Sequence, residues 1–142
     1  MKYYEKCSLG DSLSAFFSES HGPVAVVIYI GDEEARKDFC DDLEFLKFLG
    51  ESPIHGDNVE WIPSAFDSLL GFIMNYGHFA KTYFNEGKCV VVSLNPGFDA
   101  FDEGSEKEFY LFDALKRWGA KSILKIIVEA DRTFLSKVNP MP

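Results

Sequence analysis

The sequence predicts an α/β domain in two or three layers, with a mostly parallel sheet of three to four strands flanked by helices. Two apolar, largely β-branched runs, Val24–Ile30 and Cys89–Leu94, are typical of strands covered on both faces. Helical segments separate these runs and a third expected strand, Ser122–Glu129, as in βαβ crossovers. The 142 residues, 46% of them hydrophobic, suffice for one core, so we expect one domain over residues 1–142 with a frayed tail at 139–142.

Two helices are expected around the first strand. Gly10 precedes the first, Asp11–Glu19, and the second, Asp32–Leu49, begins with three acids that suit a helix N-terminus and ends at Gly50. The apolar positions of the second helix recur every three or four residues and predict its buried face. They are Ala35, Phe39, Leu43, Leu46 and Leu49, and Phe45 and Phe48 are expected to widen this stripe.

The middle of the chain predicts a long helix before the second strand. Val59–Ile62 is expected as a short strand or as an extended entry to that helix. Pro63 suits a first helical position, and Ser64 with Asp67 resembles a capping pair. The helix is therefore expected to run from Pro63 to Glu86, with Gly71 and Gly77 as weak points.

The last third of the chain predicts a helix, a strand and a closing helix. Ser105–Glu108 has the pattern of a capping box, and the helix that it opens reaches Trp118 and ends at Gly119. Ser122–Glu129 is expected as the third strand, although its isoleucines also fit a helical period. Asp131–Val138 is expected as a short closing helix.

Composition and charge argue against several classes of protein. The formal net charge of −9 disfavours a nucleic-acid-binding role, which normally needs a basic surface. The longest apolar run has seven residues, far fewer than the roughly 20 of a membrane span. The N-terminus has no apolar signal segment, and the three cysteines form no C-x-x-C pair. We therefore expect no membrane partner, structural cysteines and a reducing cytoplasm.

No pattern of catalytic residues stands out. The sequence has no Gly-x-Ser-x-Gly elbow, no phosphate-binding loop and no Gly-x-Gly-x-x-Gly fingerprint, so no cofactor is expected. The three histidines, His21, His55 and His78, are not placed beside a candidate nucleophile. The sequence thus favours a binding function over an enzymatic one.

Acidic loops follow the first two confident strands. Gly31–Glu34 and Asn95–Glu103 leave the carboxyl ends of those strands, where ligands usually bind in such sheets. If the loops converge, Asp32, Asp99 and Asp102 could hold Mg²⁺ or Ca²⁺ through oxygen ligands. A small metal-dependent hydrolase is therefore one alternative, and capping of helices by these acids is the plainer interpretation.

The charge is concentrated on the second expected helix. Residues 32–44 hold seven acids and two bases, which predicts an acidic ridge that could dock a basic protein. Two phenylalanines in the second acidic loop would add the large rings typical of interface hot spots. The predicted partner-binding residues are Asp32, Glu33, Glu34, Asp38, Asp41, Asp42, Phe98, Asp99, Phe101, Asp102 and Glu103.

The prediction for function is an immunity or inhibitor protein that neutralises a basic toxin or nuclease. Two alternatives stay open beside the hydrolase: a solvated acidic face that only aids solubility, and a structural subunit whose partner covers the aromatic surface. The order strand, two helical segments, strand, helix and strand, with the acidic balance, resembles the general plan of small barstar-type inhibitors of secreted nucleases. This resemblance lies in architecture alone and implies inhibitor function without assigning any residue to it.

Overall fold

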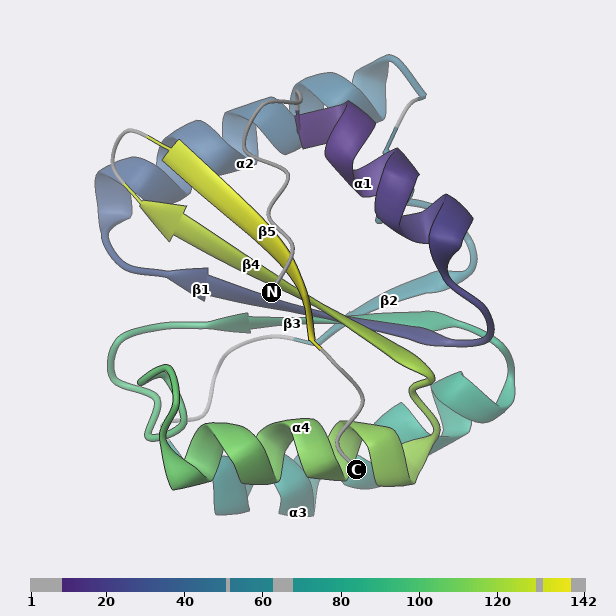
Figure 1. Ribbon diagram of the computed structural model, residues 1–142, viewed down its shortest axis with the longest axis vertical. Coiled ribbons are helices and arrows are strands. Elements are labelled where there is room, and N and C mark those ends of the chain that lie inside the picture. Colours follow the sequence, from purple (N-terminus) through teal and green to yellow (C-terminus); the bar gives the residue numbers. More distant parts are fainter. Residues whose placement is uncertain (1–8, 51, 63–67, 130–131, 139–142) are drawn as a thin grey trace.

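A five-stranded sheet with two helices on each face forms the fold (Figure 1). The computed structural model describes residues 9–50, 52–62, 68–129 and 132–138. The strand order is β2-β3-β1-β4-β5, parallel except for β5, which runs antiparallel to β4. In chain order the elements are α1 (Leu9–Glu19), β1 (Val24–Ile30), α2 (Glu33–Phe48), β2 (Val59–Ile62), α3 (Leu69–Asn85), β3 (Cys89–Leu94), α4 (Glu106–Trp118), β4 (Ser122–Glu129) and β5 (Arg132–Val138).

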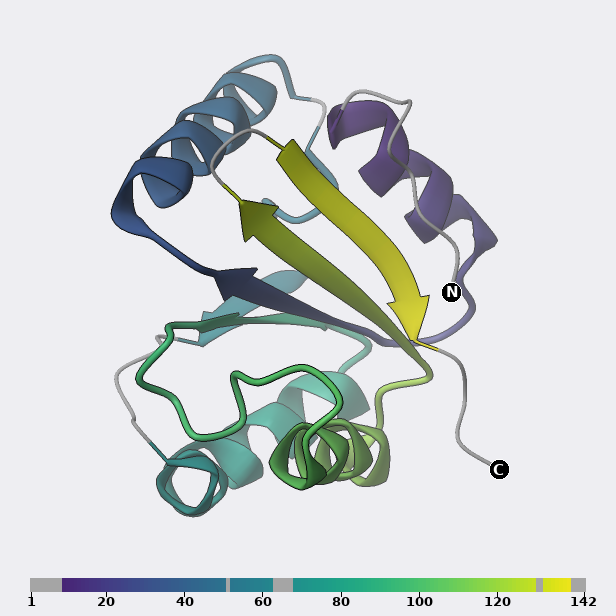
Figure 2. The same ribbon diagram turned by 60° about the vertical axis from the view of Figure 1, so that its left-hand side comes forward.

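The molecule has three layers, because α1 and α2 cover one face of the sheet and α3 and α4 cover the other (Figure 2). Alternation along β1 divides its side chains between two cores. Ala25, Val27 and Tyr29 join the core under α3 and α4, and Val24, Val26, Ile28 and Ile30 join the core under α1 and α2. Every residue of β1 is buried, which explains its unbroken run of apolar residues.

Three strand predictions are confirmed, including Ser122–Glu129, for which a helix was the alternative, and one helix prediction is wrong. Val24–Ile30, Cys89–Leu94 and Ser122–Glu129 are strands with the predicted bounds. The expected closing helix Asp131–Val138 is instead the strand β5, which adds a fifth strand. Its pairing with β4 gives β5 hydrogen-bonding partners that no local pattern reveals, and it buries Leu135 and Ser136.

α2 and α4 begin at their predicted caps, whereas α1 begins at Leu9 and includes Gly10, which was expected to precede it. Asp32 caps α2, and Ser105 caps α4, whose C-cap is Gly119. The predicted start of α3 at Pro63, Ser64 and Asp67 lies outside the described residues, as does the predicted tail at 139–142. Ser68 is the N-cap of α3, and the helix continues through both of its glycines to Asn85.

No helix among the described residues is both long and apolar enough to cross a membrane. The two cores instead hold the long apolar segments between the sheet and its helices.

Candidate functional site

The carboxyl ends of β1 and β3 lie side by side at one edge of the sheet. Tyr29 pairs with Leu94 near the ends of these two parallel strands. The chain leaves β1 toward α2 on one face and leaves β3 toward α4 on the other (Figures 1 and 2). Such a reversal is where open α/β sheets usually form ligand sites. The structure therefore starts both acidic loops from neighbouring strands, an arrangement that the sequence left open.

The first acidic loop is used for capping α2. The Asp32 carboxylate accepts a hydrogen bond from the backbone N–H of Ala35 at 2.7 Å. Glu33 and Glu34 are exposed in the first turn, and Glu33 Oε2 lies 3.6 Å from Arg36 Nη1. These charges favour the helix N-terminus through its dipole.

Asp99, in the second loop, fixes the starts of α3 and α4 relative to each other. Its carboxylate accepts a hydrogen bond from the Leu69 backbone N–H at 2.7 Å and from Lys107 Nζ at 2.8 Å. Burial by itself would raise the pKa of Asp99, but these hydrogen bonds and the Lys107 charge outweigh it and hold the pKa below its usual range. The charged Asp99 carboxylate therefore links the first turn of α3 to the first turn of α4.

The remaining predicted residues of the second loop divide between core and surface. Phe98 is 6% exposed and packs in the core under α3 and α4, and Phe101 is partly buried against that core. Asp102 and Glu103 are exposed. The two rings thus anchor the loop to this core, and the carboxylates of Asp102 and Glu103 remain at the surface.

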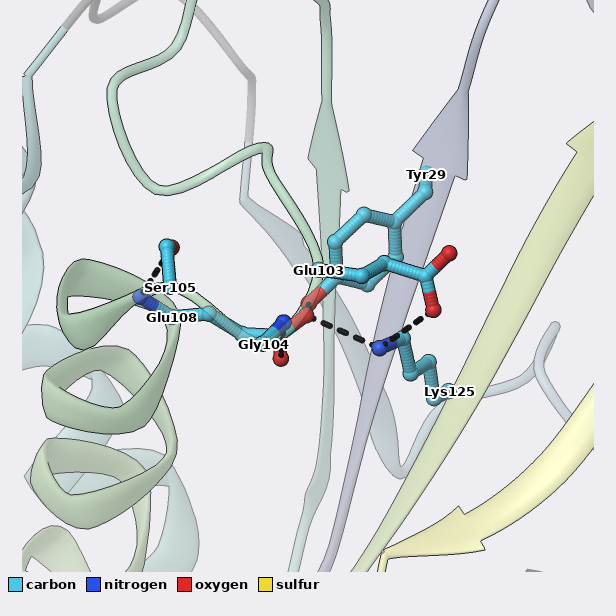
Figure 3. A network of polar contacts seen from close by, with 6 residues as sticks. All are labelled: Tyr29, Glu103, Gly104, Ser105, Glu108 and Lys125. Atoms are coloured by element: carbon cyan, nitrogen blue, oxygen red, sulfur yellow. Dashed lines mark hydrogen bonds and ion pairs between the residues drawn. The ribbon is translucent and has the colours of Figure 1, made fainter.

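A buried ionic network holds this loop against the sheet (Figure 3). Lys125, in the middle of β4, points its Nζ between Glu103 Oε1 at 2.7 Å and Glu108 Oε2 at 2.9 Å. Glu108 Oε2 also accepts a hydrogen bond from Tyr29 Oη at 2.6 Å, and Glu108 Oε1 accepts one from the Gly104 backbone N–H at 2.9 Å. Lys125 and Glu108 are 3% and 6% exposed, so each depends on the other for its charge to be compensated.

The network keeps the Tyr29 phenol protonated. Burial, followed by the hydrogen bond to Glu108, raises the pKa of Tyr29 far above its usual range. The phenol therefore stays protonated and donates to the carboxylate, and Lys125 Nζ lies over the Tyr29 ring at 4.9 Å. A cavity of about 310 Å³ opens beside Tyr29, Phe101 and Glu103. The arrangement positions the loop against the sheet.

The acids brought to this edge do not gather around one point. Among the described residues there is no group of three or more histidine, cysteine, aspartate or glutamate side chains placed to hold a metal ion. Asp32 and Asp99 each accept a hydrogen bond from a helix N-terminus, and Asp102 belongs to an exposed turn.

The acidic ridge of α2 is exposed as expected, but its aromatic residues are placed differently. Ala35, Phe39 and Leu43 form the buried side of the helix. Phe45 and Phe48 are 62% and 86% exposed, so the prediction that they widen the buried stripe is wrong. Leu49 is 47% exposed, so the prediction that it belongs to the buried face is also wrong. Helical spacing turns Phe45 and Phe48 away from the buried side of α2, Ala35, Phe39 and Leu43. We call the exposed stripe on the solvent side of the helix the outward face of α2: Glu34, Lys37, Asp38, Asp41, Asp42, Phe45, Phe48 and Leu49.

In comparisons with known proteins, no family model matches the chain and no curated protein is significantly similar to it. The case for function therefore depends on the side chains themselves.

Sequence reasoning missed the buried network, although two signals pointed to it. Lys125 interrupts a strand that is otherwise apolar through Val128, which is unusual unless the charge has a buried partner. Glu108 shares the helical spacing of Leu111, Phe112 and Leu115, the buried side of α4. The capping-box interpretation was right for Ser105, whose Oγ accepts from the Glu108 N–H at 3.2 Å, but the Glu108 carboxylate turns inward to Lys125 and Gly104.

Proposed function

We propose that this chain is an acidic protein-binding module that masks a basic partner, as an immunity or inhibitor protein does for a toxin or nuclease. One observation carries the proposal: the outward face of α2 joins exposed acids to exposed large apolar side chains. Asp38, Asp41 and Asp42 are exposed in the middle of the helix, and Phe45 and Phe48 follow one and two turns later. Arg36 lies outside this stripe by helical spacing. Lys37 lies on it, four residues before Asp41, and leaves an excess of acids there.

The two kinds of side chain suit different stages of binding. Clustered carboxylates attract a basic protein over distances of about a Debye length, roughly 10 Å at 0.1 M salt, and so accelerate its encounter. Exposed rings contribute most to affinity when a partner pocket removes them from water. We therefore expect the partner to present lysines or arginines beside an apolar pocket.

The acids of the two loops would extend this contact surface. Glu33, Glu34, Asp102 and Glu103 are exposed near the carboxyl ends of β1 and β3. Asp32 and Asp99 keep their capping hydrogen bonds in such a complex, and Phe98 stays in the core. We place this module in a reducing compartment such as the cytoplasm, where the exposed thiol of Cys40 would remain free.

The first test is capture of the partner from source lysate at about 50 mM and about 500 mM salt, followed by mass spectrometry. We expect one basic protein that is retained at low salt and weakened at high salt. The purified partner is then titrated against the variant Asp38→Asn/Asp41→Asn/Asp42→Asn and against Phe48→Ala. Each variant should weaken binding at least tenfold, and the triple variant should also flatten the salt dependence.

A charge-matched control separates the ridge from the net charge of the molecule. The variant Asp57→Asn/Glu86→Gln/Glu106→Gln also removes three exposed negative charges, but none from α2. It should bind the partner within about twofold of the unchanged protein. Equal weakening by both triple variants, or full affinity in the α2 variants, would exclude the outward face of α2 as the contact surface.

A further inference from the structure

The sheet face under α1 and α2 is covered unevenly. α2 packs mainly against β1 and β4, and α1 packs against β5. Toward β3 and β2, a cavity of about 660 Å³ separates α2 from the sheet. This volume lies within the roughly 300–1,000 Å³ typical of small-molecule sites. The cavity reaches Ile30, Ser93 and Ile62 near the carboxyl ends of the three strands, the edge at which α/β proteins usually bind ligands.

The body of the cavity is apolar and its polar groups are few. Ile28, Ile30, Phe39 and Leu43 come from β1 and the buried side of α2 and supply an aliphatic and aromatic floor. Ser93 is the polar side chain that β3 adds. A ligand in this space would therefore be held mostly by apolar contact, with a small number of polar groups to orient it.

One wall of the cavity is a rigid pair of stacked rings. The His55 and Trp61 rings lie 5.4 Å apart between centroids, with an interplanar angle of 25°. Trp61 Nε1 donates a hydrogen bond to the Ile54 carbonyl at 2.9 Å, and His55 Nδ1 shares one with Ser52 Oγ at 2.9 Å. Burial, together with the Lys47 charge, lowers the pKa of His55 against the opposing effect of Glu44, so the ring is neutral at pH 7. The two rings are thus fixed before a ligand arrives.

The opposite wall is a row of side chains on the flank of α2. Arg36, Cys40 and Glu44 follow one another at successive turns, so about 12 Å of helix separates the cation from the acid. The Arg36 contact with Glu33 is 3.6 Å long and involves side chains that are 54% and 89% exposed. Such an exposed pair contributes little, which leaves the guanidinium able to bind an anion at that end of the cavity.

We propose that this cavity binds a small planar aromatic molecule bearing an anionic group, with the ring against His55 and Trp61 and the anion at Arg36. The site lies on the sheet-facing flank of α2 and is separate from the outward face. It does not rest on the proposed protein-binding function, and either proposal can fail without the other.

Naphthalene-2-sulfonate is a suitable probe because it is planar, aromatic and anionic, and 2-naphthol serves as its planar counterpart, which is uncharged at neutral pH. The protein has two tryptophans, so a heteronuclear NMR spectrum contains two indole N–H signals. Trp118 packs against Phe72 in the core on the other side of the sheet. We expect saturable one-to-one binding that shifts the Trp61 signal and leaves the Trp118 signal in place. No shift, or equal shifts of both signals, would overturn the proposal.

Two variants test the ligand class. Arg36→Gln should weaken the sulfonate probe about tenfold and the uncharged probe less than twofold. Arg117→Gln is the matched control, because Arg117 is also an exposed helical arginine paired with an acid, Asp113, at 3.1 Å. Equal effects of the two arginine variants would reject an anion site at Arg36.

A third variant tests the location. Cys40 is exposed at the cavity wall, so Cys40→Trp should fill the opening while the core stays intact, as near-ultraviolet circular dichroism would verify. Loss of binding of both probes is the expected result. A folded Cys40→Trp protein that binds both probes as before would overturn the site, and the NMR and arginine results decide the question if this variant does not fold.

Discussion

Lys125 shows how much a single charged residue can determine at the centre of an apolar sheet. Its ammonium group is buried between Glu103, in the loop that follows β3, and Glu108, in the first turn of α4, and it lies over the Tyr29 ring. A buried ion is tolerated only when its partners compensate for the lost water. The position of the second acidic loop is therefore tied to one side chain of β4.

Lys125→Met should destabilise the protein by about 3 kcal/mol, because Glu108 would keep a buried charge without its cation. Glu103→Gln should cost less than about 1 kcal/mol, since the Glu103 side chain is 49% exposed and water can replace the contact. Urea unfolding of both variants checks the difference. Similar losses in the two variants would mean that Glu103, and not the buried Glu108, is the main partner.

Asp99 provides a second test at the residue scale, with a dependence on pH. Asp99→Asn should destabilise the protein by about 1 kcal/mol at neutral pH, because it weakens the hydrogen bonds from Leu69 and Lys107. The folded state lowers the Asp99 pKa, so this stabilisation is complete above the ordinary carboxyl pKa and is lost as pH falls through the folded value. Urea unfolding should therefore show a smaller difference in free energy of unfolding between the unchanged protein and Asp99→Asn at about pH 3 than at about pH 7. A pH-independent difference would contradict a role for the charge.

The two acidic loops show which parts of the site were accessible from sequence. Asp32 precedes its own helix, so its capping role is a local pattern that the sequence reveals. Asp99 caps a helix that begins 30 residues earlier in the chain, and Glu108 turns away from its local cap toward a strand 17 residues later. These contacts depend on sheet order, which no local pattern contains.

At the scale of elements, strands buried on both faces were predicted to the residue, whereas β5 was not. The run Val24–Ile30 can be satisfied only by burial on both faces, so its bounds are evident in the sequence. β5 mixes polar and apolar residues, among them Thr133, Phe134 and Ser136, in an order that matches neither the two-residue period of a strand nor the period of a helix. This segment forms a strand because it pairs with β4.

The end of α4 offers an element-scale prediction. Gly119 has φ +131° as the C-cap, and a Cβ there would lie 2.9 Å from Phe84 Cβ. Gly119→Ala should therefore cost about 2–3 kcal/mol, from backbone strain and the displaced contact with α3. Gly87→Ala is the control, because Gly87 also has a positive φ, +79°, but open space around it. It should cost about 1 kcal/mol in thermal or urea unfolding; equal losses would show that the contact with Phe84 is unimportant.

Across the whole molecule, negative charge is distributed unevenly. Residues 1–100 carry 16 acidic and seven basic side chains, whereas residues 101–142 carry seven of each. Part of this excess is compensated by helix N-termini and ion pairs, but the outward face of α2 holds acids spaced three and four residues apart. Like charges at these spacings repel each other. The fold therefore tolerates a destabilising surface, which is understandable if a partner covers it.

This repulsion leads to a prediction for the stability of the whole molecule. Asp38→Asn/Asp41→Asn/Asp42→Asn should stabilise the folded state by about 0.5–1 kcal/mol at low salt, because four like-charge pairs along α2 disappear against one opposite-charge pair, Lys37–Asp41, and the helix propensities of Asn and Asp are similar. The like-charge pairs are Glu34–Asp38, Asp38–Asp41, Asp38–Asp42 and Asp41–Glu44. The gain should shrink in about 500 mM salt, which already screens the repulsion. Thermal unfolding at both salt concentrations measures it, with Asp57→Asn/Glu86→Gln/Glu106→Gln as the charge-matched control. A stabilised α2 variant that no longer holds the partner would show that these acids are kept for binding at the expense of stability. A destabilised variant would instead assign them to the support of the fold.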